Sequence, residues 1–395
     1  MLPFACASHI TPGVMPVRRL PHILALLALP TLWGCGQSAP QGPAPPSAAS
    51  LAAITDDGGA PREPLGRAID ALFDSEAVGS TAALVVMKRG SVIVERYGEG
   101  IDKDTRLPGW SMGQCVTSLM IGQLVSDGRL RLNESAPVPA WQRPGDPRGV
   151  ITLKQLLQMR SGLRHVETTD SEDDENRESD RLRMLFLDGR DDMAAYAEAQ
   201  PLEAPAGRVF ENSSATPVIL SDLAARVLEP GHDPARRRRA VGEFLRNRVL
   251  LPIGMDSTLV GYDRAGTMIG AAMIHADARD WAKLGEFLRH KGSVKGAQIL
   301  PRRWIQFMLS PSPRNDAYGA GVWLNHAPAG DQARLYPGTA PSNLFACLGE
   351  HGQYVIGSPS QLLTVVRLGE SDAVQERALH DRMGALIALF PGWKD

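Results

Sequence analysis

The pattern of hydrophobic and polar positions predicts strands at both ends of the chain and helices between them. Residues 82–97 alternate apolar and polar positions on both sides of a Lys-Arg-Gly-Ser turn at 88–91, which predicts a β-hairpin. Short β-prone runs near the other end of the chain are separated by Gly, Pro and Ser: 321–324, 344–348, 353–356 and 362–368. Residues 373–390 then have apolar residues at helical spacing, which predicts a last helix.

The segment from 111 to 310 is mainly helical by the same criterion. The runs that predict helices are 116–124, 153–159, 215–228, 241–250 and 277–288. We therefore expect an α/β fold of the α+β type, in which an antiparallel sheet is formed by both chain ends and flanked by helices. Residues 64–110 and 312–395 would form this sheet lobe, and 111–311 a helical lobe, because 64–395 exceeds the ~250–300 residues at which one core stops growing.

The N-terminal region is typical of an export signal. After Met15, an alternative start, two arginines precede the mostly apolar run 20–33, which is too short to span a bilayer and is followed by Gly34 and Cys35. This ending of residues 1–35 resembles a bacterial lipobox, whose cysteine is lipidated; the alternative is plain secretion with an unmodified Cys35. Residues 36–63 are rich in Pro, Ala, Gly and Ser, which predicts a disordered tether. We expect an exported cell-envelope lipoprotein that faces the periplasm or cell surface and contacts the membrane only through its lipid.

Composition and charge exclude several function classes. The chain has 42 basic and 44 acidic residues, a net charge of −2, which argues against a nucleic-acid partner. The run Arg236–Arg239 predicts a solvated helix face, and the charged stretch 172–183 predicts either a solvated loop or the border of a binding cleft. The four cysteines lack C-x-x-C spacing and the histidines are isolated, so we expect no metal site and no cofactor.

Residues 110–118 (WSMGQCVTS) resemble the active-site helix of the serine β-lactamase and penicillin-binding-protein superfamily, in particular the class C-like esterase and 6-aminohexanoate-dimer hydrolase branch. Further motifs of that branch are matched in order by 122–130 (GQLVSDGRL), 151–163 (ITLKQLLQMRSGL), 251–258 (LPIGMDST), 277–301 and 349–354 (GEHGQY). The resemblance covers about 82–368. It implies the β-lactamase or transpeptidase-like fold, and a β-lactamase-related serine hydrolase acting on an ester, amide or β-lactam-like bond through Ser111.

The residues for proton transfer depart from the family pattern. The family activates its serine with a lysine three residues later, and here that residue is Gln114, which cannot take a proton. None of the seven lysines has a serine three residues before it. The family tyrosine maps onto Asn212 in the segment 207–214 (GRVFENSS), or onto Phe210 in an alternative register. Loss of a general base typically lowers a rate by ~10²–10⁴-fold.

The binding half of the site is retained in the resemblance. It implies that the backbone N–H groups of Ser111 and Glu350 form an oxyanion hole, with Gly349 and His351 beside the substrate. On general grounds Ser111 is alternatively a helix cap, and His351 a hydrogen-bonded structural residue.

Cys115 and Cys347 are expected to be small core residues. Because the resemblance places both near the serine, a disulfide or a reactive thiol in an oxidising compartment is the alternative.

Two functions follow from this pattern. The first is a serine hydrolase whose activity is weak or lost. The alternative is a catalytically silent cell-envelope protein that binds a peptidoglycan-like or other small ligand in the same cleft. In either case the partner is a small-molecule or peptide-like substrate or ligand.

Overall fold

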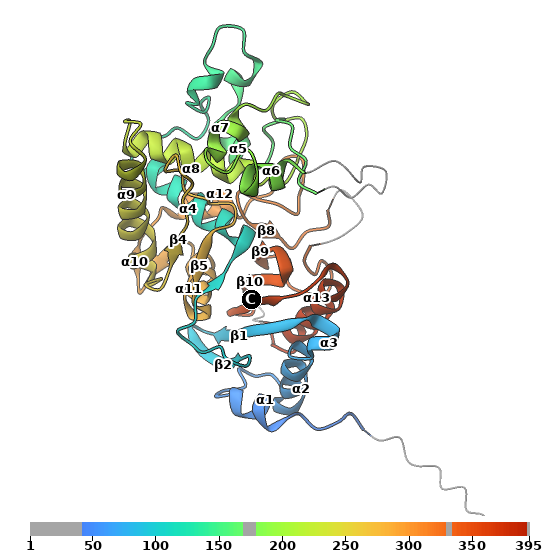
Figure 1. The fold of residues 1–395 in the computed structure, drawn as a ribbon. Coiled ribbons are helices and arrows are strands. Elements are labelled where there is room, and N and C mark those ends of the chain that lie inside the picture. Colours follow the sequence, from blue (N-terminus) through green and yellow to red (C-terminus); the bar gives the residue numbers. More distant parts are fainter. Residues whose placement is uncertain (1–41, 169–178, 329–333, 393–395) are drawn as a thin grey trace, which may run out of the picture. The chain divides into compact units, whose positions relative to one another are not determined.

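The computed structural model describes residues 42–168, 179–328 and 334–392, and the chain forms one compact unit from Pro45 onward. A six-stranded sheet with the order β2-β1-β11-β10-β9-β8 lies at its centre (Figure 1). Its strands are β1 (Ser80–Lys88), β2 (Ser91–Tyr97), β8 (Trp323–Leu324), β9 (Phe345–Gly349), β10 (Gln353–Ser358) and β11 (Leu363–Glu370). All neighbouring strands pair antiparallel, and β1 pairs with β11. Both chain ends therefore build one sheet, as predicted.

The predicted hairpin is β1–β2. Its turn places Arg89 at φ 54° and Gly90 at φ 83°, the left-handed conformation that tight hairpin turns require. Along β1 both faces of the strand are buried: Val85 belongs to one hydrophobic core and Leu84 to the other. The sheet thus separates two cores, as expected for a strand whose successive side chains point to opposite faces.

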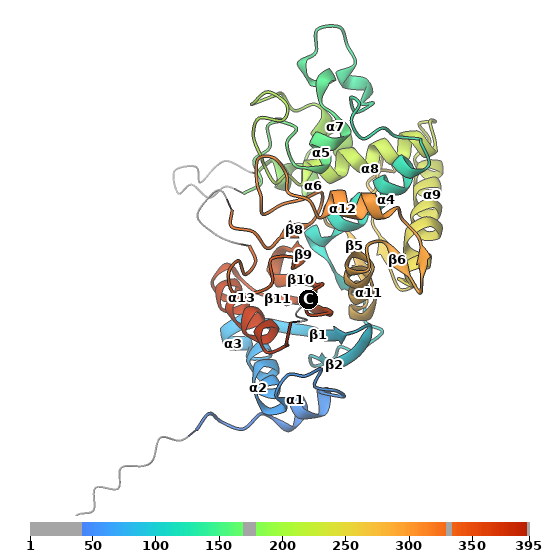
Figure 2. The same ribbon diagram turned by 180° about the vertical axis from the view of Figure 1, so that it is seen from behind.

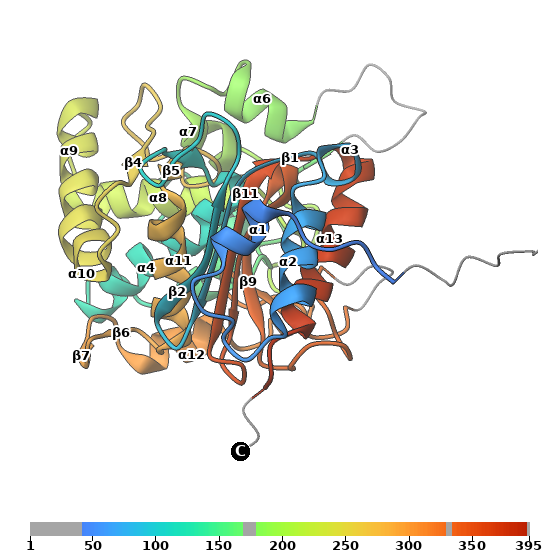
Figure 3. The same cartoon turned by 90° about the horizontal axis from the view of Figure 1, so that it is seen from below.

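Four helices cover one face of the sheet, and α11 (Ala278–Arg289) covers the other (Figure 3). The four are α1 (Ala48–Ala53), α2 (Arg62–Leu72), α3 (Ser75–Val78) and α13 (Ala373–Ala388). On the α11 face, Gly285 permits close packing, because a Cβ there would lie 2.7 Å from the Thr364 side chain and 2.9 Å from that of Val355. This glycine belongs to the stretch 277–301, which resembles a family motif.

The remaining helices form the part of the molecule that follows residue 111. They are α4 (Gly113–Ser126), α5 (Leu153–Leu157), α6 (Asp180–Phe186), α7 (Met193–Glu198), α8 (Ala215–Leu228), α9 (Pro234–Leu245), α10 (Leu251–Ile253) and α12 (Arg302–Met308). Short strands accompany them: β3 (Leu107–Pro108), β4 (Leu259–Val260), β5 (Ile274–Ala276), β6 (Ser293–Val294) and β7 (Ala297–Gln298). Helix α4 is buried from Gly113 to Leu124, and α12 lies against it (Figure 2), where Trp304 Nε1 donates to the Ser118 carbonyl at 3.1 Å. The α+β fold prediction is confirmed.

The predicted disordered tether over 36–63 is wrong for residues 48–53, which form α1, and for residues 62 and 63, which begin α2. Ser47 caps α1 by accepting from the Ser50 N–H at 3.1 Å, and the Ser50 hydroxyl donates to Asp70 of α2 at 2.7 Å. Ile54 then forms a β-bridge with Val94. A cap and buried contacts therefore order a segment whose composition alone favoured disorder.

Other predictions fare differently. Of the run Arg236–Arg239, Arg237 is buried and pairs with Asp222 of α8, so the run is not wholly a solvated face. The predicted export signal, Cys35 and most of the stretch 172–183 lie outside the described residues, and the signal and the lobe boundaries stay predictions. Within the described part of the chain, every helix is too short or too polar to cross a membrane.

Candidate active site

Ser111 lies in the short 3-10 helix η1 (Trp110–Met112), which leads directly into α4. Trp110, the residue before it, has φ 47°, a left-handed conformation that non-glycine residues seldom adopt. Strand β9 approaches this turn so closely that a Cβ on Gly349 would lie 2.3 Å from the Gly109 carbonyl oxygen. Only glycine fits at position 349, and this close approach brings the end of β9 beside Ser111.

The Glu350 side chain binds Ser111 at two points. The Ser111 N–H donates to Glu350 Oε2 at 3.1 Å, and the Ser111 hydroxyl donates to Oε1 at 2.9 Å. The family resemblance implied a role for the backbone of Glu350 only. Instead its carboxylate accepts from the backbone N–H of Ser111 that the resemblance implied as an oxyanion donor, so a substrate oxygen would have to displace it there.

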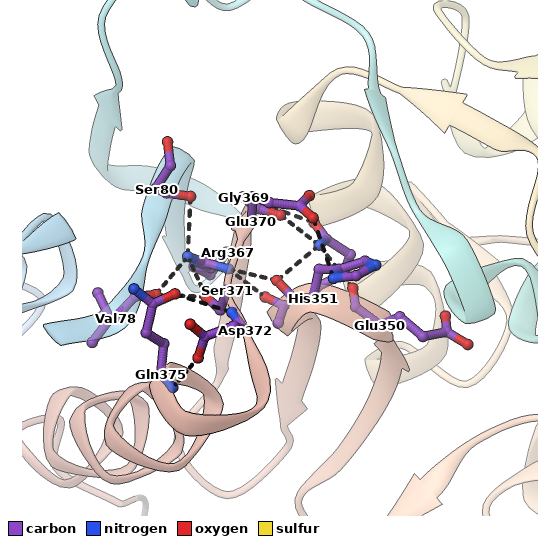
Figure 4. A network of polar contacts seen from close by, with 12 residues as sticks. Val78, Ser80, Glu350, His351, Arg367, Gly369, Glu370, Ser371, Asp372 and Gln375 are labelled. Atoms are coloured by element: carbon purple, nitrogen blue, oxygen red, sulfur yellow. Dashed lines mark hydrogen bonds and ion pairs between the residues drawn. The ribbon is translucent and has the colours of Figure 1, made fainter. Parts of the chain in front are cut away.

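A buried arginine fixes the segment that carries Glu350, the 3-10 helix η5 (Glu350–Gly352) (Figure 4). Arg367 of β11 is fully buried and donates to the carbonyls of His351 at 3.1 Å and Gly352 at 3.0 Å. Burial lowers its pKa to about 10. The Gln353 side chain also donates to the Glu350 carbonyl at 2.9 Å. The backbone of η5 is therefore held by buried donors, while the Glu350 side chain projects toward Ser111.

His351 has φ 60° and lies beside the serine turn without contacting the serine through a described hydrogen bond. Its ring packs edge-on against Trp110, with centroids 5.4 Å apart, and its Nδ1 lies 3.2 Å from Glu370 Oε1. These contacts fit the structural interpretation of this histidine better than a role as base.

A chain of ion pairs continues from Glu350 into the helical region. Arg181 of α6 lies 3.0 Å from Glu350 Oε1 and 3.6 Å from Glu167 Oε1. Glu167 accepts from the Ser214 N–H and from His165, each at 2.8 Å, and from the Ser214 hydroxyl. Burial by itself would raise the pKa of Glu167, but the hydrogen bonds from His165 and Ser214 outweigh it and hold that pKa below its usual range.

Gln114 is buried, and its Oε1 accepts a hydrogen bond from the Tyr318 hydroxyl at 3.1 Å. Tyr318 is fully buried, and that burial raises the pKa of its phenol far above the usual value, so it remains a neutral donor. The rings of Phe210 and Tyr318 are 5.2 Å apart. A tyrosine hydroxyl thus contacts the end of the Gln114 side chain, and it comes from a segment that matches none of the family motifs.

Asn212 and its neighbour Glu211 are both partly buried. Among the described residues no donor reaches the buried Oδ1 of Asn212, which is rare for a buried polar atom. Burial raises the pKa of Glu211 to about 6. No hydrogen bond joins Asn212 to Ser111 among the described residues. The proton relay expected of the family tyrosine therefore has no counterpart at this position.

Cys115 and Cys347 form a disulfide, with their Cα atoms 6.2 Å apart. Both cysteines are buried, as expected of core residues, but they are paired rather than free. The bond joins α4, which directly follows the Ser111 turn, to β9, which leads to Glu350. The described residues contain no group of three or more His, Cys, Asp or Glu side chains placed to hold a metal ion.

The chemistry of this arrangement is limited by its proton acceptors. The single hydrogen of the Ser111 hydroxyl goes to a carboxylate, which is ordinarily a weaker base than the neutral amine of a lysine. The motifs did not predict three groups of this site: the side chains of Arg181, Tyr318 and Glu350. Only Arg181 carried a signal, since the charged stretch 172–183 predicted either a solvated loop or the border of a binding cleft.

Comparison with known proteins agrees with this architecture. The family model described as Beta-lactamase matches residues 69–389. A 6-aminohexanoate-dimer hydrolase of Paenarthrobacter ureafaciens is 23% identical over 314 residues, covering 78% of this chain and 77% of that protein. A Bacillus anthracis structure assigned to the same hydrolases has a TM-score of 0.63 at 19% identity, with 80% of each chain covered. A penicillin-binding protein homolog from Caulobacter crescentus has a TM-score of 0.56 at 17% identity, covering 82% of this chain and 98% of that one. The chain belongs to the Beta-lactamase family of serine hydrolases.

Proposed function

We propose that this family member hydrolyses esters, amides or β-lactams weakly or not at all, and that it retains the Ser111 site for binding a ligand. The observation that carries this proposal is the pair of hydrogen bonds from Ser111 to Glu350, at 3.1 Å from the N–H and 2.9 Å from the hydroxyl. An anion at the expected oxyanion donor opposes a developing oxyanion, because like charges in one small site repel.

The residue at position 114 supports the same proposal. Gln114 has no proton-accepting amine, and its oxygen is already engaged by Tyr318. The decreases in rate caused by losing the two proton-transfer groups need not multiply, since catalytic groups act as a unit. Residual catalysis of ~10³ over water is still compatible with a retained binding site.

An active-site label tests the proposal. Wild type and Ser111→Ala are treated with a fluorophosphonate and with a fluorescent penicillin, and the adducts are measured by intact mass. We expect little or no label on wild type. We also expect p-nitrophenyl acetate turnover by wild type to lie within about 10-fold of the Ser111→Ala control, because loss of a general base greatly lowers the rate. Rapid, stoichiometric labelling that Ser111→Ala abolishes would contradict the proposal.

A working hydrolase with Glu350 as the substitute base is the second candidate, favoured by the 2.9 Å contact between Ser111 Oγ and Glu350 Oε1. In that mechanism the hydroxyl proton passes to the carboxylate as the serine oxygen attacks the acyl carbon. The variant Glu350→Gln separates the two candidates. A base lost in this variant lowers ester turnover by ~10²-fold or more, whereas removal of a blocking carboxylate leaves turnover unchanged or raises it.

We also propose an envelope location for the protein, based on residues 1–35 and their Gly34-Cys35 ending. Stable anchoring takes more than one acyl chain, which a lipid-modified cysteine supplies. Fractionation of wild type and Cys35→Ala, with intact mass of each, tests this location. Equal solubility of the two proteins and a wild-type mass without lipid would rule it out.

A further inference from the structure

Three donor groups converge on the Glu350 carboxylate from two separate parts of the chain, two of them through hydrogen bonds and the third through an ion pair. The N–H and hydroxyl of Ser111 lie 3.1 and 2.9 Å from its two oxygens, and an Arg181 guanidinium nitrogen lies 3.0 Å from Oε1. The side chains of Glu350 and Arg181 remain 26% and 22% exposed. This cluster is therefore accessible from solvent, in contrast to the fully buried Arg367.

Among the described residues, no other acceptor hydrogen-bonds to the Ser111 N–H or hydroxyl, and Glu350 is the nearer of the two acids beside Arg181. Glu167, the second acid beside Arg181, is 3.6 Å away and already accepts from Ser214 and His165. The Ser111 N–H lies in the first turn of η1, where the helix itself supplies no backbone acceptor, so it needs an acceptor from elsewhere. If the Glu350 side chain left, Ser111 would lose both of its acceptors and Arg181 its nearer partner.

We propose that Ser111 and Arg181 form a carboxylate-binding site in which Glu350 is the intramolecular occupant, and that the external ligand is a small organic carboxylate. This inference rests on the proposed binding function and names its ligand class. Hydrogen bonds that a guanidinium and a backbone N–H donate to a carboxylate are charge-assisted and therefore stronger than hydrogen bonds between neutral groups.

Exchange of the two carboxylates requires only the Glu350 side chain to turn away. The η5 backbone is held by Arg367 and by Gln353, as Figure 4 shows for Arg367, and neither contact involves the Glu350 carboxylate. The carboxylate is attached covalently to this backbone only through the two methylene groups of its own side chain. A rotation of that side chain exposes the three donors without moving the sheet.

The tethered carboxylate competes with any free one. A group held by a short flexible link has an effective concentration on the order of millimolar, so a free carboxylate must exceed that level to bind wild type. Removal of the tethered group abolishes the competition. Glu350→Ala should therefore bind a small carboxylate at least about 10-fold more tightly than wild type.

Acetate is the probe, because its two carbons correspond to Cγ and Cδ of the glutamate that Glu350→Ala removes. Binding is followed by the line width of ¹³C-labelled acetate and by the unfolding temperature, at constant ionic strength. Acetamide, of the same shape without charge, is the ligand control. Glu370→Ala is the protein control, since Glu370 contacts His351 rather than Ser111.

We expect saturable acetate binding to Glu350→Ala, little to wild type and Glu370→Ala, and none of this strength with acetamide. Adding Arg181→Met should weaken binding at least about 10-fold, as expected for loss of a charge-assisted pair. Arg164→Met is its matched control, because Arg164 pairs with Asp180 instead. If Glu350→Ala does not fold, Glu350→Gln replaces it, and its neutral amide should compete less than the native carboxylate.

The proposal is overturned if the folded Glu350 variant shows no saturable binding, if acetamide binds as well as acetate, or if Arg181→Met and Arg164→Met have equal effects. These results are independent of hydrolysis. Rapid ester turnover by wild type would contradict the proposed function, while the acetate titration of the Glu350 variant would still report on the carboxylate site.

Discussion

The disulfide between Cys115 and Cys347 ties the residue after Gln114 to a strand position three residues before Glu350. It joins α4 to β9 across a sequence separation of 232 residues. Two halves of the site that come from distant parts of the chain are thereby linked covalently. The bond constrains the segments that carry Ser111 and Glu350 in both the folded and the unfolded chain.

We predict that the double variant Cys115→Ala/Cys347→Ala has a lower free energy of unfolding than wild type, by about 2–4 kcal/mol. Closing a long loop restricts the unfolded chain, although the entropic account of this stabilisation depends on the model. Urea titrations of wild type with and without reductant, and of the double variant, measure the difference. Reduced wild type should match the double variant, whereas three coincident titrations would show that the bond contributes nothing.

Much of the fold was predictable because its signals are local. The turn at 88–91 predicted the β1–β2 hairpin, and the helical spacing of 215–228 predicted the bounds of α8. The position of Ser111 at the start of a buried helix followed from the family motif around it. Composition misled at 48–53, where a Ser47 cap and the Ser50–Asp70 bond order a segment rich in Ala and Ser.

The contacts of the site could not be predicted in the same way. Glu350 and Ser111 are 239 residues apart, so their pairing depends on how β9 approaches η1. Tyr318 reaches Gln114 from 204 residues away. Motif matching assigns each residue the role of its family counterpart. Where that counterpart contributes only its backbone N–H, as at position 350, the motif gives no information about the side chain.

We predict that stability falls as pH rises from about 4.5 to about 8 through the titration of Glu198. Burial and the neighbouring Asp222 raise its pKa to about 8 in the folded protein, from an ordinary value of 4.5. The folded state then holds a proton that the unfolded state has released, so unfolding is favoured by higher pH in this window. One proton contributes a slope of at most about 1.4 kcal/mol per pH unit.

Glu198→Gln should flatten this dependence and raise stability at pH 8, because the amide mimics the protonated acid. Urea unfolding at several pH values between 4.5 and 8 measures the slope. Glu203→Gln, at an exposed carboxylate, is the matched control. An unchanged slope in Glu198→Gln would assign the pH dependence to other groups.

We predict that β-lactam turnover is absent or very slow. A lactamase must both acylate and deacylate, and each step moves a proton that neither Gln114 nor Asn212 can carry. Nitrocefin hydrolysis followed by absorbance measures the rate, with Ser111→Ala as the background. A kcat in the usual enzyme range of ~1–10³ per second, lost in Ser111→Ala, would show that another group acts as base.

Repair of the proton-transfer half of the site is the most demanding prediction. Gln114→Lys places an amine one helical turn from Ser111, where the Tyr318 hydroxyl now contacts the glutamine oxygen. Burial of position 114 favours the neutral amine that a base requires, since desolvation lowers the pKa of a lysine. Asn212→Tyr, or Phe210→Tyr in the alternative register, adds the missing hydroxyl.

The gain should be partial while Glu350 holds Ser111. The hydroxyl proton is directed to Glu350 Oε1, so the new lysine must compete with that carboxylate for it. Gln114→Lys with Asn212→Tyr should raise p-nitrophenyl ester hydrolysis by ~10²-fold, the lower end for general-base catalysis. Adding Glu350→Gln should raise it further, because a neutral amide no longer opposes an oxyanion at the Ser111 N–H.

Each combination is measured beside its own Ser111→Ala control. A gain that survives Ser111→Ala would place the chemistry elsewhere, and no gain in either tyrosine register, with circular dichroism unchanged, would mean that the site geometry no longer supports acyl transfer.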